Sequence, residues 1–421
     1  MGQRALVCMS GGVDSTLAAL LLRDRGWETE GITYWFWSFP GAPDYAGRTK
    51  CCSLNLAAQA AREVGIPHRT VNASDAFQRL VLDDFVVRYR RGETPNPCGR
   101  CNRHVRFGLA LALAETNGFD CVATGHHVRI LRDAAGRPQL HRGQDPNKDQ
   151  SYFLYGLTKA DLEHLRFPVG DLTKDQVFAS ARARGLSAAA LPESQDLCFA
   201  QGGRADFLFQ AEDFRPGPIL DLQGSRLGTH DGLPRYTIGQ RRGLGISAER
   251  PLYVVALDPA RNAIVVGEDA DLFGSGLVAE DANFLSGTPP ADGARVSAKI
   301  RYRSPAMPAT YRHHEPEGFA VHFNTPQRAI TPGQIVALYD GDRLLGGGTI
   351  VARLAEGCRD SLWPSRTPAI IRDWRGGRAD ETTGLENRRA HEAPRVRIPP
   401  PPPDTADVSP GGKLTPWRTL R

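Results

Sequence analysis

The pattern of apolar residues changes at about Phe207, and this change constrains the fold more than any other feature of the sequence. Before it, short strand-like runs alternate with helix-like runs, beginning with a strand-like run at residues 4–9 and a helix-like run at residues 14–25. Strands and helices that alternate in this way form a parallel sheet with helices on both faces. The sequence therefore predicts an α/β fold for residues 1–205.

After Phe207, glycine and proline become dense and helical periodicity disappears. Short β-like runs with turn residues between them take its place, at residues 252–257, 263–268, 294–303, 319–323, 334–341 and 346–354. This pattern is typical of small β-rich domains, here one or two barrels. From Cys358 the composition changes again, and residues 399–403 are consecutive prolines. We expect residues 358–421 to form a mostly disordered tail.

Charge and hydropathy exclude several classes of protein. The chain of 421 residues has 52 Lys and Arg against 47 Asp and Glu, but residues 358–421 hold 12 of the former and 8 of the latter, which leaves +1 for the rest. Net charge therefore gives no argument for RNA binding. No run approaches the roughly 20 apolar residues of a membrane span, and the N-terminus lacks the apolar core of a signal peptide. We expect a cytoplasmic protein whose cysteines are not a disulfide scaffold.

The strongest local signal is the segment Ser10-Gly-Gly-Val-Asp-Ser15, directly between the first predicted strand and helix. Its glycines let the backbone approach phosphate groups, its amide N–H groups converge, and the helix N-terminus adds its positive end. The lysine of a Walker A loop is absent. The alternative is an ordinary turn in which Asp14 caps the helix. The strand–loop–helix setting favours anion binding.

This segment resembles the PP-loop of the ATP pyrophosphatases, which split ATP between its α and β phosphates and adenylate an oxygen. The loop alone leaves the acceptor open, because it also occurs in GMP and NAD synthetases, argininosuccinate synthetase and tRNA lysidine synthetase. Four further segments narrow the acceptor: residues 94–102 (TPNPCGRCN), 123–127 (ATGHH), 194–199 (SQDLCF) and 236–245 (YTIGQRRGLG). In this order and spacing, over residues 4–357, they closely resemble the tRNA-specific 2-thiouridylase family.

The resemblance implies both an architecture and an activity. The architecture is a parallel-sheet PP-loop domain (residues 1–205), a small central tRNA-binding domain (206–275) and a C-terminal β-barrel (276–357). The activity is ATP-dependent 2-thiolation of the wobble uridine of lysine, glutamate and glutamine tRNAs, with AMP and pyrophosphate released. The implied cofactor is ATP with Mg²⁺. The implied partners are tRNA and a cysteine-desulfurase or sulfur-relay donor protein.

Two cysteines carry the sulfur chemistry that the resemblance implies. Cys198 matches the family cysteine that receives sulfur as a persulfide, and Cys101 matches its partner thiol. In the family scheme ATP adenylates O2 of uridine, the persulfide sulfur attacks C2, and AMP leaves. Cys101 then supplies the second thiol, so that a Cys101–Cys198 disulfide remains to be reduced. The alternative for either residue is a small buried cysteine.

Cys98 departs from the family pattern, in which aspartate is common at this position. A thiol with a free pKa of about 8.5 does not replace a carboxylate in proton transfer. Cys98, Cys101 and Cys198 can instead be read as ligands of an iron–sulfur cluster with one iron open to sulfide, as in related RNA thiolases. The sequence leaves both routes open, a metal-free persulfide route and a cluster route.

The resemblance also assigns binding positions. On the nucleotide side these are Cys8, Met9, Ser10, Gly11, Gly12, Val13, Asp14, Ser15, Tyr34 and Gly125. On the tRNA side they are Asn96, Pro97, Cys98, His126, Lys148, Asp149, Gln150, Arg301, Tyr302 and Gln334. Tyr34 stands where the family often has methionine. Lys148 and Arg301 suit phosphate contacts, and the alternative for each tRNA-side residue is a solvated surface side chain.

Two other functions fit part of the sequence. An amidating ligase of the PP-loop class would act on a small molecule, but it has no use for Cys101 together with Cys198. A non-catalytic RNA-binding protein would need neither the intact loop nor the two thiols. Sulfur incorporation into tRNA, against AMP formation with a free amine, separates the main hypothesis from the first rival. Pyrophosphate release with a tRNA separates it from the second.

Overall fold

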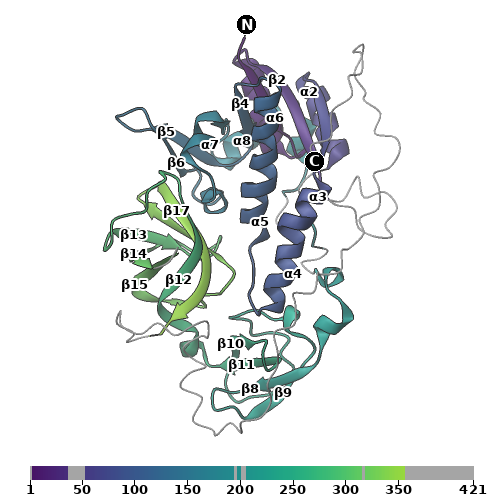
Figure 1. Ribbon diagram of the computed structural model, residues 1–421. Helices are drawn as coiled ribbons and strands as arrows, with labels where there is room; N and C mark the ends of the chain where they lie inside the picture. The colour runs from purple at the N-terminus through teal and green to yellow at the C-terminus, as the bar shows by residue number, and fades with distance from the viewer. Residues whose placement is uncertain (1, 37–52, 194–196, 201–204, 315–317, 356–421) are drawn as a thin grey trace.

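The computed structural model describes residues 2–36, 53–193, 197–200, 205–314 and 318–355. These residues form a five-stranded, a four-stranded and an eight-stranded sheet, which occupy separate regions of the molecule in Figure 1. No helix in these ranges is long and apolar enough to cross a membrane. The predicted tail and residues 194–196 of the SQDLCF motif lie outside the described residues.

The first sheet is parallel throughout. Its order is β3-β2-β1-β4-β7, and its strands are β1 (Arg4–Cys8), β2 (Glu28–Trp35), β3 (His68–Asn72), β4 (Cys121–Thr124) and β7 (Leu165–Arg166). The central strand β1 pairs in parallel with β2 on one side and with β4 on the other. Because parallel strands end at the same edge of a sheet, the segments that follow β1 and β4 meet there. The predicted α/β fold is confirmed.

Helices cover both faces of this sheet because its central strand is apolar on both sides. On β1, Ala5 and Val7 belong to the core beneath α1 (Val13–Asp24), α2 (Leu54–Val64) and α8 (Lys174–Ala183). Leu6 and Cys8 belong to the opposite core, which is covered by α6 (Gly108–Thr116). Successive side chains of a strand point to opposite faces, so a strand buried on both faces is a continuous apolar run.

Capping signals fix the ends of two of these helices, and α1 differs from them. Ser53 accepts a hydrogen bond from the Leu56 amide (3.3 Å) at the start of α2, and Thr173 forms a capping box with Gln176 at the start of α8. The N-cap of α1 is Gly12, which has no side chain with which to cap the helix. A helix start built in this way can offer its first N–H groups to an anion.

The helix that ends with α6 begins earlier than the apolar pattern predicts. We expect a helix over residues 107–116, but α5 (Pro97–Arg100) and a π-helical stretch (Cys101–Phe107) lead directly into α6. Figure 1 shows α5 and α6 one above the other on a common axis. The added part is rich in Arg, Asn and His and therefore has no apolar period to detect. π-helical turns occur frequently at functional sites.

Short helical elements connect the strands. Residues after β3 form α3 (Ser74–Phe77), a π-helical turn (Gln78–Leu82) and α4 (Asp83–Arg90). Figure 1 shows α4 extending from the first sheet toward the central strands, where Arg90 forms an ion pair with Asp213 (2.7 Å). The other short helices are α7 (Lys159–His164) and 3₁₀ turns at Ser151–Leu154, Ser187–Ala190, Asp206–Leu208, Ala211–Phe214, Leu233–Arg235 and Asp269–Leu272.

The second sheet has the order β10-β11-β8-β9 and a small core of its own. Its strands are β8 (Gly217–Leu220), β9 (Arg226–His230), β10 (Tyr253–Asp258) and β11 (Ala263–Gly267). The predicted strands at residues 252–257 and 263–268 are confirmed as β10 and β11. The sequence pattern did not indicate β8 and β9, which are short and interrupted by glycine and proline.

The third sheet contains a closed barrel of antiparallel strands. These are β12 (Phe273–Phe284), β13 (Arg295–Lys299), β14 (Met307–His314), β15 (Gly318–Arg328), β16 (Ile335–Asp340) and β17 (Arg343–Leu354). β12 pairs with both β15 and β17, which closes the barrel. The predicted C-terminal β-barrel is confirmed, whereas the domain boundaries given above stay predictions. β12 was missed because Gly274 and Gly276 interrupt its apolar run.

A hairpin from the N-terminal half extends the barrel's sheet. β5 (Val128–Arg132) and β6 (Pro138–Arg142) pair with each other, and β6 pairs with β17 through His141 and Arg343. Val128 and Leu140 are fully buried in the core beneath α6. The hairpin thus belongs to both the first core and the barrel's sheet, and it fixes the barrel beside the strand ends (Figure 1). The sequence pattern gave no indication of it.

Removal of residues 358–421 should leave the fold intact, because the barrel closes within residues 273–354. We expect the melting temperature of a variant that ends at Gly357 to stay within about 2 °C of that of the full chain, as measured by calorimetry. A matched variant that ends at Asp342 lacks β17, so its barrel is open and its melting temperature should fall sharply. A large loss on removal of residues 358–421 alone would contradict this prediction.

Candidate active site

A cavity of 1790 Å³ lies at the edge of the first sheet where β1 and β4 end, and the barrel contributes to its wall. All ten residues predicted on the nucleotide side line it. Of the residues predicted on the tRNA side, those that line it are Asn96, Pro97, Cys98, His126, Lys148, Asp149, Gln150, Tyr302 and Gln334. Arg301, Cys101 and Cys198 are not part of its wall, although Leu197 and Ala200 are.

Hydrogen bonds within the Ser10–Ser15 loop hold it in one shape at the start of α1. The Ser10 amide donates to Ser15 Oγ (3.1 Å), and the Ser15 hydroxyl donates to the Gly12 carbonyl (3.1 Å). The Ser10 and Ser15 hydroxyls lie 3.2 Å apart, and the Gly12 amide is 3.4 Å from Ser10 Oγ. Two hydroxyls and the helix N-terminus therefore face the same part of the cavity, as an anion site requires.

Two glycines let the backbone segments at this edge approach one another. Gly11 has a φ of 82°, and a Cβ on it would lie 2.6 Å from Leu56 Cβ of α2. A Cβ on Gly125, in the segment after β4, would lie 2.5 Å from the Ser15 amide nitrogen. Only a residue without a side chain allows such contacts. The close approach of Gly125 explains why the segments after β1 and β4 form one continuous wall.

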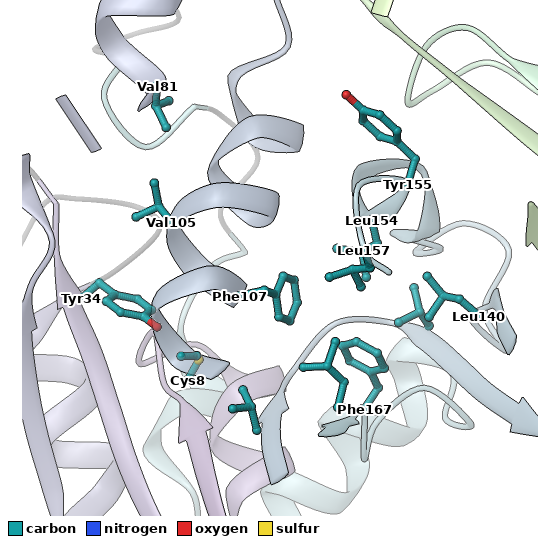
Figure 2. Packing of buried hydrophobic residues seen from close by; sticks show 14 of the residues in the cluster. Cys8, Tyr34, Val81, Val105, Phe107, Leu140, Leu154, Tyr155, Leu157 and Phe167 are labelled. Carbon is teal, nitrogen blue, oxygen red and sulfur yellow. The ribbon is translucent and has the colours of Figure 1, made fainter. Parts of the chain in front are cut away.

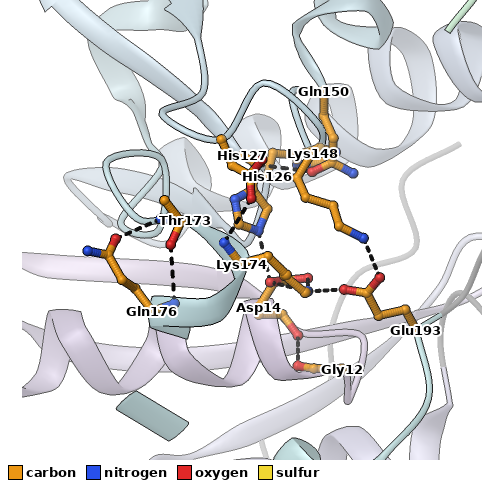
Figure 3. A network of polar contacts seen from close by, with 12 residues as sticks. Gly12, Asp14, His126, His127, Lys148, Gln150, Thr173, Lys174, Gln176 and Glu193 are labelled. Carbon is orange, nitrogen blue, oxygen red and sulfur yellow. Dashed lines mark hydrogen bonds and ion pairs between the residues drawn. The ribbon is translucent and has the colours of Figure 1, made fainter. Parts of the chain in front are cut away.

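Asp14 is the centre of a polar network that joins distant parts of the chain (Figure 3). Its carboxylate accepts hydrogen bonds from Lys174 Nζ of α8 (2.7 Å to each oxygen) and lies 2.9 Å from His127 Nε2. Lys174 also forms an ion pair with Glu193 (2.8 Å), which in turn pairs with Lys148 (2.5 Å). The network places two ammonium groups beside the Ser10–Ser15 loop.

The network keeps its carboxylates ionised. Burial by itself would raise the pKa of Asp14, but the hydrogen bond from His127 and the charge of Lys174 outweigh it and lower that pKa. The pKa of Glu193 is lowered in the same way, since Lys148 and Lys174 outweigh its burial. A carboxyl group with a depressed pKa contributes stability above its unfolded pKa, and this contribution is lost as the pH falls through the folded value. Both carboxylates of the network are therefore ionised at neutral pH.

Sequence reasoning missed Lys174, His127 and Glu193 as site residues. His127 belongs to the quoted ATGHH segment, in which only Gly125 and His126 were assigned. Lys174 follows the N-cap Thr173 at the start of α8, but no helix was predicted there and nothing in the sequence indicates that Lys174 reaches the sheet edge. Glu193 carries no local signal, because only the fold brings it to Lys148 and Lys174.

The segment that carries Cys98 is held by all three parts of the molecule. The Thr94 amide donates to the Pro332 carbonyl (2.9 Å), and the Gln334 amide group donates to the Thr94 carbonyl (2.7 Å). The Thr94 hydroxyl lies 3.0 Å from that of Thr237 in the central region. Gln334, predicted to contact tRNA, thus positions this segment in the structure.

Asn96 and Gly99 fix the helical turn that contains Cys98. Asn96 Oδ1 accepts a hydrogen bond from the Gly99 amide (3.3 Å), which caps α5. A Cβ on Gly99 would lie 2.6 Å from Ile335 Cδ1 of β16, so the turn packs directly on the barrel. Cys98 is half-buried and lines the cavity next to this contact.

Cys101 and Cys198 pack at the edge of the same hydrophobic core and are both half-buried. Cys101 begins the π-helical stretch, one helical turn after Cys98. Phe199 is 1% exposed, and its ring lies 5.2 Å from that of Phe85 (centroid to centroid), which anchors the segment with Cys198. Two thiols separated by 97 residues therefore adjoin one core.

Cys8 and Tyr34 form the apolar side of the cavity near the loop. Figure 2 shows the Tyr34 hydroxyl directed toward Cys8, with Phe107 close by. Burial raises the pKa of the Cys8 thiol to about 11, against smaller opposing effects of Arg106 and Tyr34. Tyr34 also donates a hydrogen bond to the Arg106 carbonyl (2.8 Å). Cys8 is therefore a neutral packing residue here and not a thiolate.

The other predicted tRNA-side residues make contacts within the protein. Asp149 is buried and accepts hydrogen bonds from Ser151 N and Oγ (3.1 and 2.9 Å), while Gln150 accepts one from the His127 amide (3.0 Å). His126 is buried beside Thr124. The guanidinium of Arg301 donates to the Arg328 carbonyl, and the ring of Tyr302 lies tilted against that of Phe153 (4.6 Å between centroids).

The three cysteines do not form a ligand set. Within the described ranges, which include Cys98, Cys101 and Cys198, no group of three or more His, Cys, Asp or Glu side chains is placed to hold a metal ion. An iron–sulfur cluster needs its thiolates to converge on one centre. The described residues therefore give no support to a cluster, and we derive no step through one.

The parallel sheet with its glycine loop at the start of α1, followed by the barrel, defines a nucleotide-binding α/β class. Three family models match in sequence: the "tRNA methyl transferase HUP domain" (residues 3–202), the "tRNA methyl transferase PRC-barrel domain" (205–268) and the "Aminomethyltransferase beta-barrel domain" (274–350). Together they span the sheets described above.

Close relatives identify the family. The chain is 46% identical over 370 residues to the tRNA-specific 2-thiouridylase MnmA of Roseiflexus sp. (strain RS-1), an alignment that covers 82% of this chain and 99% of the relative. It is also 46% identical over 355 residues to the protein of the same name from Magnetococcus marinus, covering 83% and 99%. The chain belongs to the tRNA-specific 2-thiouridylase family.

Gly125→Ala should destabilise the protein, because the new Cβ would press on the Ser15 amide at the start of α1. Overpacking of this kind costs about 1–3 kcal/mol, which calorimetry or denaturant unfolding would detect. Gly12→Ala is the matched control: the nearest atom to its Cβ would be Ser10 Oγ at 3.5 Å, an ordinary contact. Equal stability of the two variants would contradict the proposed close approach of Gly125.

Proposed function

We propose that this chain is an ATP-dependent sulfurtransferase that converts the wobble uridine of lysine, glutamate and glutamine tRNAs to 2-thiouridine. The observation that carries the proposal is that the Ser10–Ser15 loop lines the cavity, while two half-buried thiols, Cys101 and Cys198, pack against the hydrophobic core that adjoins it. The name shared by the relatives supports the tRNA substrate and the 2-thio product.

In the first step, O2 of uridine attacks the α-phosphorus of ATP, which forms an adenylated uridine and releases pyrophosphate. The Ser10–Ser15 loop binds the phosphates through its amide and hydroxyl groups, and Tyr34 and Gly125 border the rest of the nucleotide. Lys174 and Lys148 neutralise charge that develops on the departing pyrophosphate. Asp14 and Glu193 are the carboxylates beside the loop that would hold a Mg²⁺ ion brought by ATP, and the ion would supply positive charge at the phosphates.

In the second step, the terminal sulfur of a Cys198 persulfide attacks C2 of the adenylated uridine, and AMP leaves with the oxygen. The Cys101 thiolate then attacks Sγ of Cys198 and breaks the persulfide S–S bond. The sulfur stays on C2 as the thione, and a Cys101–Cys198 disulfide forms. An external dithiol reduces this disulfide, and a cysteine desulfurase or sulfur-relay protein restores the persulfide.

The two thiols distinguish this reaction from the transfers that the family-model descriptions name. Methyl transfer and aminomethyl transfer need no pair of cysteines, whereas the sulfur route uses one as carrier and the other as resolving thiol. The barrel contributes to the cavity wall, and Thr237 of the central region contacts Thr94, which also lines the cavity. We therefore place the tRNA across residues 206–357 with the target base in the cavity, and we place the reaction in the cytoplasm.

Mass spectrometry of nucleosides from tRNA incubated with the protein, ATP and a sulfur source tests the proposal. We expect 2-thiouridine with the wild type and none with Cys198→Ser or Cys101→Ser, because serine removes the soft nucleophile at little steric cost. Binding of tRNA should be unchanged, since it depends on phosphate and loop contacts. Absence of 2-thiouridine with the wild type and competent tRNAs, or normal thiolation by Cys198→Ser, would refute the assignment.

Cys98→Asp tests the persulfide route. In the persulfide route Cys98 only borders the cavity that would hold the target base, so the aspartate common in the family should keep or raise the thiolation rate, and no iron should be needed. Iron content and thiolation are measured side by side in the wild type and the variant under strict anaerobiosis. Iron in the wild type, with loss of both iron and activity in Cys98→Asp, would overturn this route, because a hard carboxylate suits an iron–sulfur centre poorly.

A further inference from the structure

Two cations of the cavity wall have no anionic partner. Lys299, the last residue of β13, is only 8% exposed, yet its ammonium makes no hydrogen bond or ion pair with any described residue. Arg142, the last residue of β6, forms no ion pair in the same ranges, and its buried Nε has no hydrogen-bond partner. Both line the cavity. Buried charges normally have a partner of opposite charge, so these two cations require an explanation.

Aromatic rings, not carboxylates, support the two cations. The Lys299 ammonium lies 5.6 Å from the ring centre of Tyr302 and 6.0 Å from that of Tyr152. The Arg142 guanidinium lies 4.2 Å from the ring centre of Tyr339. Ring faces attract cations but leave their charge unneutralised and their N–H groups available to a ligand.

The nearest acidic group does not neutralise them. The charge of Asp149 acts on Lys299, but this carboxylate is engaged by the Gly143 amide (3.3 Å) and by Ser151, and it is not within ion-pair distance of Lys299. Burial lowers the pKa of Lys299, and the positive charge of Arg142 lowers it further, against the opposing effect of Asp149. Together the two cations leave net positive charge in a partly dry site.

We propose that Lys299 and Arg142 form a phosphate-binding subsite for the RNA backbone beside the target nucleotide. The inference rests on the proposed function for its RNA substrate, but it assigns a site separate from the Ser10–Ser15 loop. A phosphate group would supply the anion that both cations lack, and arginine and lysine are the usual phosphate ligands.

The position of the subsite favours an RNA phosphate over the phosphates of ATP. Lys299 comes from the barrel and Arg142 from the hairpin joined to it, whereas the nucleotide loop, Lys148 and Lys174 form their own cluster around Asp14 and Glu193. The cavity of 1790 Å³ also exceeds the roughly 300–1,000 Å³ of a pocket for one small ligand, so it has room for a second group.

The test is the salt dependence of tRNA binding to the full-length Lys299→Met variant. Loss of one phosphate contact should lower the slope of log K against log salt concentration by about 1, while the dissociation constants of ATP and pyrophosphate stay unchanged. Lys159→Met, at an exposed lysine of α7, is the matched control and should keep the wild-type slope. Because methionine removes an unpaired buried charge, the melting temperature of Lys299→Met should be equal or higher.

Each other outcome overturns the subsite. Weaker ATP or pyrophosphate binding with an unchanged tRNA slope would assign the pair to the nucleotide's phosphates. A lower melting temperature with an unchanged slope would assign Lys299 a structural role. If Lys159→Met lowered the slope equally, the effect would come from the loss of any positive charge and not from a site at Lys299. Arg142→Met provides a second variant with the same expected change in slope.

If the wild type thiolates tRNA while the slopes of both variants stay at the wild-type value, only the subsite fails. If the wild type neither binds nor thiolates tRNA, the proposed function fails as well.

Discussion

The contact between Asp14 and Lys174 is the interaction on which the site depends most. Asp14 stands in the first turn of α1 and Lys174 begins α8, so one ion pair joins the loop after β1 to a helix 160 residues later. His127 adds the segment after β4, and Glu193 adds the chain that leads to Cys198. The loop proposed to bind the nucleotide and Glu193, five residues before Cys198, are thus parts of one charged network.

The same edge of the sheet explains why the barrel is part of the site. The β5–β6 hairpin joins the barrel's sheet to the first core, and the loop before β16 binds the Thr94 backbone. The helix that carries Cys98 and Cys101 therefore starts from a point held by the barrel and by the central strands. In a parallel sheet the strand ends supply only one side of a site, and here added domains supply the rest.

Much of this organisation could be predicted from the sequence, and the failures have physical causes. The loop, the parallel sheet and most barrel strands follow from local patterns, because apolar periodicity and glycine position reflect local geometry. The hairpin β5–β6 and strand β12 do not, since their pairing partners are distant in sequence and their residues are mixed in polarity. Glu193 and Lys299 are site residues only because the fold brings them to the cavity, and no local pattern distinguishes them from surface charges.

The cations of the cavity form two sets. Lys148 and Lys174 are paired with carboxylates, whereas within the described ranges Lys299 and Arg142 are not, and this difference suggests different functions. Around Asp14 each of the two lysines has a carboxylate partner, and in the proposed function these lysines would turn to the phosphates of ATP. Around Lys299 the chain accepts an unneutralised buried charge, which costs stability in the absence of a ligand. An anion that binds there gains affinity in return, because the cation has already been desolvated by folding and need not be desolvated again on binding. The two sets therefore suit two different ligands, one that replaces carboxylates and one that completes a site left open.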